Sequence, residues 1–117
     1  MRVKRGQGML AERELDERIP SEAVLRAVHA FLDSAEWMLE FDDDITPIPR
    51  RPEPVILSRA FIKAHVADVF LGDHFEAVVA LAPEKIGENI VARGGVLRLY
   101  FDRDGRFISE DRYPPVR

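Results

Sequence analysis

The sequence contains no cysteine among its 117 residues. Disulfide bridges, thiolate nucleophiles and cysteine-ligated zinc are therefore excluded. No run approaches the roughly 18 apolar residues that cross a bilayer, so we expect no membrane association. The basic N-terminal stretch lacks the apolar segment of a secretion signal, because Glu12, Arg13 and Glu14 follow too soon. Together these absences predict a cytoplasmic protein.

An excess of basic residues is missing as well. The formal net charge is -4 at pH 7, whereas a protein that neutralises DNA phosphates usually carries a basic face. The basic residues gather in two short places, one near the N-terminus and one at Arg50 and Arg51, among prolines. We therefore do not expect a nucleic-acid partner.

The composition is that of an ordinary globular domain. Apolar residues make up 46% of the chain and charged residues 32%, which is not the composition of a disordered protein. The length suits one domain. We predict a flexible basic arm over residues 1–8 and a single α+β domain over 9–117. That domain is expected to pack two to three helices on a small antiparallel sheet ending in a C-terminal β-hairpin.

Three segments are predicted as helices: 9–18, 21–33 and 59–71. The second is indicated most clearly, because its apolar residues recur at helical spacing and form one stripe. Ser21 and Ser58 are placed to cap the free N–H groups at the starts of the second and third helices. The stripe of the second helix consists of Val24, Leu25, Val28, Phe31, Leu32 and Ala35.

Residues 36–42 are predicted as a strand, with a continuing helix as the alternative. Trp37, Leu39 and Phe41 occupy alternate positions, and acidic residues lie between and beside them. This two-residue period is typical of a half-buried strand. Residues 43–54 carry half of the eight prolines, so we expect a stiff, extended connection there.

Residues 73–82 support two interpretations. The segment Asp73–Glu76 has the form of a helix capping box, and the apolar positions after it suit a helix. A buried strand is the alternative, because a short apolar run does not reveal its period. We favour the helix. A short strand is predicted at 55–57, and Gly72 is expected to take the left-handed conformation that ends the helix before it.

The C-terminal segment is predicted to form a hairpin. Asp102–Gly105 matches a type I turn in which Gly105 is left-handed and creates a bulge. The expected pairs, all favourable, are Phe101 with Phe107, Tyr100 with Ile108, Arg98 with Glu110, and Asp102 with Arg106. The residues expected on the core face are Leu97, Leu99, Phe101 and Phe107. A two-residue turn would instead set Leu99 against Glu110.

Among the three histidines, His65 is the candidate for chemistry. On the predicted helix 59–71 it lies within the apolar stripe, with Asp68 one turn further on the same flank. The functional interpretation is a general base or a ligand in a pocket. We prefer a core histidine bonded to Asp68 or to a backbone carbonyl, because the chain offers no cysteine or serine-elbow nucleophile to activate. His29 falls at the edge of its stripe.

Neither a metal nor a cofactor is expected. Asp42–Asp44 is the densest acidic run, and the Asp102–Gly105 turn resembles a fragment of a calcium loop. Neither completes the alternating ligands and distal glutamate of such a loop. Gly94 and Gly95 precede a strand, whereas glycine-rich phosphate motifs open a helix. Pro49–Pro52 has the spacing of a polyproline ligand, which chance supplies often.

We therefore expect a protein that works by binding a protein partner, such as a regulator, an inhibitor or an immunity-type protein. The candidate binding residues are Trp37, Asp42, Asp43 and Asp44. Trp37 is either part of the core, which we prefer, or an exposed interface anchor. The alternative is a small enzyme or ligand-binding domain with a cavity around His65 and Asp68. Enzymatic activity is the less favoured hypothesis, and homo-oligomerisation stays open.

Overall fold

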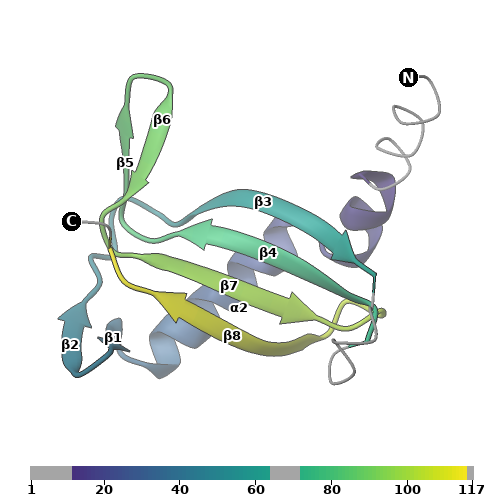
Figure 1. The fold of residues 1–117 in the computed structure, drawn as a ribbon, viewed down its shortest axis with the longest axis horizontal. Helices are drawn as coiled ribbons and strands as arrows, with labels where there is room; N and C mark the ends of the chain where they lie inside the picture. Colours follow the sequence, from purple (N-terminus) through teal and green to yellow (C-terminus); the bar gives the residue numbers. More distant parts are fainter. Residues whose placement is uncertain (1–11, 64–71, 116–117) are drawn as a thin grey trace.

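The protein folds as a small α+β domain in a computed structural model that describes residues 12–63 and 72–115 (Figure 1). Residues 12–18 are helical, and the helix α2 (Ser21–Ser34) follows. Eight strands come next: β1 (Met38–Phe41), β2 (Asp44–Pro47), β3 (Val55–Ile62), β4 (His74–Ala80), β5 (Pro83–Ile86), β6 (Asn89–Ala92), β7 (Val96–Phe101) and β8 (Phe107–Tyr113). The predicted α+β class and the C-terminal strand pair are confirmed, with two helices in the described residues. The predicted arm at 1–8 lies outside those residues.

One antiparallel sheet of four strands, in the order β3-β4-β7-β8, forms the body of the domain. The hairpins β1–β2 and β5–β6 extend from the same end of this sheet in Figure 1. The helix α2 runs behind the sheet in that view, and no described helix covers the face turned toward the viewer. One face of the sheet packs on α2, and no helix among residues 12–63 and 72–115 covers the other, which we call the open face.

The core lies between α2 and the sheet. On α2, the stripe residues Val24, Val28 and Leu32 are fully buried, which confirms the predicted apolar stripe. The residues that face them from the sheet alternate along two strands and are Phe75, Ala77, Val79, Leu97, Leu99 and Phe101. The predicted cap at Ser21 is wrong, since Pro20 holds the N-cap position and makes no side-chain bond there.

The strand predicted over 36–42 is confirmed for Met38–Phe41, β1, whereas Glu36, Trp37 and Asp42 have positive φ and lie outside the strand. Trp37, Leu39 and Phe41 are only 5%, 1% and 6% exposed, and the alternating residues point outward. The proline-rich segment departs from the prediction, because residues 44–47 form the strand β2 rather than an unpaired connection. The two-stranded sheet accepts Pro47 because this proline lies at the strand end, where a missing N–H breaks no continuing ladder.

The helix predicted at 59–71 is wrong in its described part. Residues 55–62 form one strand, β3, which pairs with β4 along its whole length. The ring of Phe61 lies 5.0 Å from that of Phe75, and Ser58 is a strand residue rather than a cap. Cross-strand packing outweighs local helix propensity here. Residues 64–71 lie outside the described residues, whereas Gly72 has the predicted positive φ, 62°.

The helix favoured over residues 73–82 is also wrong, and the alternative, a buried strand, is what the structure contains. β4 lies between β3 and β7, so it is covered at both edges and largely buried on both faces. Its apolar run consequently lacks the alternation that identifies a half-exposed strand. Asp73 and Glu76 therefore form no capping box.

The predicted turn of the C-terminal hairpin is confirmed. Gly105 has φ of 85°, its N–H donates to the Asp102 carbonyl over 2.9 Å, and Asp102 N–H donates to the Arg106 carbonyl over 2.8 Å. The side chain of Asp102 also accepts from the backbone N–H groups of Asp104 and Arg106, at 2.8 and 2.9 Å. The turn is thus determined by local hydrogen bonds.

The register beyond that turn differs from the prediction. Phe101 pairs with Phe107 as expected, but a bulge at Ile108 shifts the remaining pairs by one residue. The observed pairs are Tyr100 with Ser109, Leu99 with Glu110, and Arg98 with Asp111. Phe107 is 44% exposed rather than in the core, because it lies on the edge strand beside the bulge.

Candidate functional site

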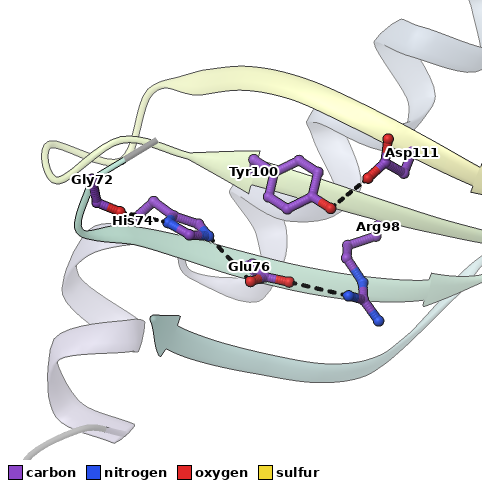
Figure 2. A network of polar contacts seen from close by, with 6 residues as sticks. All are labelled: Gly72, His74, Glu76, Arg98, Tyr100 and Asp111. Atoms are coloured by element: carbon purple, nitrogen blue, oxygen red, sulfur yellow. Dashed lines mark hydrogen bonds and ion pairs between the residues drawn. The ribbon is translucent and has the colours of Figure 1, made fainter. Parts of the chain in front are cut away.

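A cluster of polar side chains occupies the open face of the four-stranded sheet. His74 and Glu76 alternate with core residues along β4, and Arg98 and Tyr100 alternate with core residues along β7. The two-residue period of a strand therefore projects all four away from α2. With Asp111 of β8 they form the polar cluster shown in Figure 2.

The histidine of this cluster is held from both sides. His74 is 3% exposed; its Nδ1 lies 2.9 Å from the Gly72 carbonyl oxygen and its Nε2 lies 3.1 Å from Glu76 Oε2. Each ring nitrogen therefore faces an acceptor oxygen within the fold. Because both nitrogens have partners, neither is free to accept a proton from a substrate.

Glu76 links the histidine to an arginine. Its Oε2 faces His74, and its other oxygen, Oε1, lies 3.6 Å from Arg98 Nη1 (Figure 2). The Glu76 side chain is only 17% exposed. A carboxylate this sheltered is stabilised when it lies between two donors. The cluster thus ties the adjacent strands β4 and β7 together on the open face.

Tyr100 and Asp111 form the second half of the cluster. The Tyr100 hydroxyl donates to Asp111 Oδ2 over 2.5 Å, across the β7–β8 pair (Figure 2). Burial of the phenol, followed by its bond to the Asp111 carboxylate, raises the pKa of Tyr100 well above its ordinary value. The folded protein therefore favours the protonated phenol.

The raised pKa of Tyr100 predicts a loss of stability at alkaline pH. The stabilisation is complete below the unfolded pKa of about 10 and is lost as pH rises toward the higher folded value. Urea midpoints measured between about pH 9 and pH 11.5 should fall with pH in the wild type and fall less in Tyr100→Phe. Equal pH dependence in the two proteins would contradict this assignment.

The candidate binding residues from the sequence are separated along β1. Asp42, Asp43 and Asp44 are exposed at the β1–β2 turn, whereas Trp37 precedes the other end of β1 and is 5% exposed. The core interpretation of Trp37 fits this burial, and an exposed anchor does not. His65 and Asp68 lie outside the described residues, so the dyad predicted for them remains a prediction.

An apolar groove lies at the base of the β5–β6 hairpin. Its volume is about 340 Å³, and it is lined by Leu57, Ile90, Val91, Ala92, Val96 and Pro114. Leu57 and Ile90 are 44% and 41% exposed. Sequence analysis missed this groove because neither the hairpin at 83–92 nor the bulge in β3 near Leu57 was predicted.

The acidic turn, Asp42–Asp44, lies next to this groove. A second hollow of about 240 Å³ is lined by Phe41, Asp42, Asp44, Thr46, Pro114 and Pro115. Since Pro114 lines both hollows, the acidic turn and the apolar groove flank the same proline. Residues far apart in the sequence are thereby brought to one surface.

The polar cluster left a signal in the sequence that the helix interpretation hid. If 73–82 is taken as a strand, then His74 and Glu76 share one face, as do Arg98 and Tyr100 on the predicted hairpin. The cross-strand pairs Glu76 with Tyr100 and Phe75 with Phe101 place the two sets side by side. The apolar groove left no such signal.

Comparisons with known proteins give no information about the function. No family model matches the sequence, and no curated protein or solved structure matches it. Within residues 12–63 and 72–115, no helix is long and apolar enough to cross a membrane. In the same residues no three histidine, aspartate or glutamate side chains gather where they would hold a metal ion.

Proposed function

We propose that this protein acts by binding a protein partner through the apolar groove and the acidic turn beside it. The partner segment carries an apolar anchor side chain for the groove and one or two basic residues for the turn. The observation that carries the proposal is the junction of the two features at Pro114.

The groove supplies the apolar part of such a contact. Its lining is mostly aliphatic, and Leu57 and Ile90 remain more than two-fifths exposed. A concave apolar patch beside charged residues is typical of a place where a partner buries one anchor side chain. Binding energy at such sites comes mainly from the few side chains that are fully desolvated.

The turn supplies the electrostatic part. Asp42, Asp43 and Asp44 are exposed, and none of them forms an ion pair with another described residue. Three adjacent uncompensated carboxylates attract a basic segment, which speeds association and selects the orientation of the partner. The net charge of -4 adds to this preference for a basic partner.

The alternative hypothesis is an enzyme or ligand-binding domain with a cavity around His65 and Asp68, and it stays a hypothesis. Among the described residues, the buried histidine, His74, has both ring nitrogens engaged. Binding of a partner is therefore the function that the described surface favours.

Selection from a library of phage-displayed random peptides tests the proposal. We expect the enriched peptides to carry a large apolar residue within a few positions of Lys or Arg. Ile90→Ser should weaken their binding by about tenfold, because the buried apolar area is lost. Asp42→Asn with Asp44→Asn should weaken binding several-fold at low salt and less at high salt. Asparagine tolerates the positive φ of 55° at position 42.

Two matched controls use the same hairpin. Ile86 is 49% exposed but lies outside the groove, and Glu88 is exposed at the turn between β5 and β6. Ile86→Ser and Glu88→Gln should leave peptide affinity unchanged. Peptides without a basic or apolar pattern, or an Ile90→Ser variant that binds like Ile86→Ser, would refute the proposed surface.

A further inference from the structure

A third hollow lies between α2 and the start of β1, at the end of β1 opposite the acidic turn. Its volume is about 370 Å³, and it is lined by His29, Asp33, Trp37, Arg50, Arg51 and Glu53. α2 contributes the first two of these residues, one turn apart, and the proline-rich segment contributes the last three. We call it the tryptophan pocket.

The two carboxylates of this pocket are already engaged. Asp33 Oδ1 accepts a hydrogen bond from Trp37 Nε1 at 2.7 Å and lies 3.6 Å from Arg50 Nη1. Glu53 Oε2 lies 2.9 Å from His29 Nε2. Each carboxylate therefore faces a donor within the pocket, which reduces its repulsion of an incoming anion.

The guanidinium groups of Arg50 and Arg51 have N–H donors that are not used within the pocket. The Arg50 guanidinium stacks over the Trp37 ring, 4.9 Å from its centroid, and directs one nitrogen toward Asp33. Arg51 is exposed and forms no ion pair with any other described residue. Since a guanidinium has five N–H donors and no acceptor, the remaining hydrogen-bonding capacity of these two side chains is for donation alone.

The wall that carries these arginines is stiff. Pro49 and Pro52 flank the pair directly, and Pro54 follows Glu53. Proline fixes φ, so the backbone that presents both guanidiniums loses little further entropy when a ligand binds. Adjacent donors on a stiff segment favour a ligand group with several acceptor oxygens.

We propose that the tryptophan pocket binds the phosphate group of a small phosphate monoester. Arg50 and Arg51, which both line the pocket, donate to its terminal oxygens. A tetrahedral phosphate offers three terminal oxygens to these two guanidiniums, whereas a carboxylate offers two. This site is independent of the proposed partner surface.

Trp37 provides a built-in probe, because it is the only tryptophan in the chain. Its fluorescence should change saturably when inorganic phosphate or phosphoserine is added at constant ionic strength. Acetate over the same concentrations should give no saturable change. A saturable response to inorganic phosphate alone would limit the ligand to the free ion and refute the monoester.

Arg51→Gln is the decisive variant, since Arg51 is exposed and forms no ion pair within residues 12–63 and 72–115. It should weaken phosphoserine binding by about tenfold, as loss of one charge-assisted contact does. Arg26→Gln, which removes an exposed cation elsewhere on α2, should bind like the wild type.

A second measurement follows the Trp37 indole N–H by two-dimensional NMR in the same titrations. A shift that saturates with the fluorescence change supports the site. No saturable change by either method, equal affinity in Arg51→Gln and Arg26→Gln, or an equal response to acetate would each overturn the proposal.

Discussion

Gly105→Ala is expected to destabilise the protein strongly. Gly105 has φ of 85°, and a Cβ at this position would lie 2.1 Å from the carbonyl oxygen of Arg18. That oxygen belongs to backbone at the end of the first helical segment, so it cannot rotate away as a side chain would. Left-handed strain and the clash together should cost roughly 2–5 kcal/mol of unfolding free energy, measured by urea denaturation.

Gly87→Ala separates the cost of the left-handed backbone from the cost of the clash with Arg18. Gly87 also has positive φ, 63°, but an added Cβ there meets no atom within 4 Å. The unfolding free energy of this control should therefore fall only by the cost of the left-handed backbone, about 1–2 kcal/mol. The remaining difference measures the contact between the β7–β8 turn and the Arg18 backbone. Equal losses in the two variants would show that this contact is absent in solution.

Glu76→Ala should have the second large effect. Glu76 is 17% exposed and faces both His74 Nε2 and Arg98 Nη1, at 3.1 and 3.6 Å. Removing the carboxylate leaves a buried ring nitrogen without its partner, and unpartnered buried polar groups are costly. We expect a loss of roughly 2–4 kcal/mol in unfolding free energy, again from urea denaturation.

Glu84→Ala is the matched control for that change. Glu84 pairs with Arg93 on the β5–β6 hairpin, where the two side chains are 51% and 54% exposed. An exposed ion pair contributes little, so the variant should stay within about 0.5 kcal/mol of the wild type. If Glu76→Ala and Glu84→Ala lost the same stability, the polar cluster would not be holding the strands together.

Where the signal was local, prediction from sequence succeeded. The apolar stripe of α2, the alternation around Leu39 and the Asp102–Gly105 turn each depend on residues within a few positions of one another. Periodicity and turn chemistry act over that distance. The exposed acidic turn and the buried Trp37 were also predicted correctly from such local patterns.

Prediction failed where the neighbouring strand decides the structure. β3 and β4 contain short apolar runs that suit a helix or a strand equally, and their mutual pairing selects the strand. The predicted register of the hairpin was wrong for a related reason. One bulged residue, Ile108, shifts the pairing so that Glu110 lies opposite Leu99 instead of Arg98. A bulge depends on how the edge strand twists over the sheet.

By itself, then, the sequence determined the α+β class, the helix α2, the β7–β8 turn and the acidic run at Asp42–Asp44. Each of these follows from the types and spacing of residues that are close together in the sequence. Only the tertiary structure decided which side chains meet. The groove, the polar cluster and the tryptophan pocket each join elements from separate parts of the chain. A local pattern can show which side chains of one strand share a face, but not which strand or helix they will meet. Long-range packing brings Pro114 between the groove and the acidic turn, and sets Arg50 over Trp37.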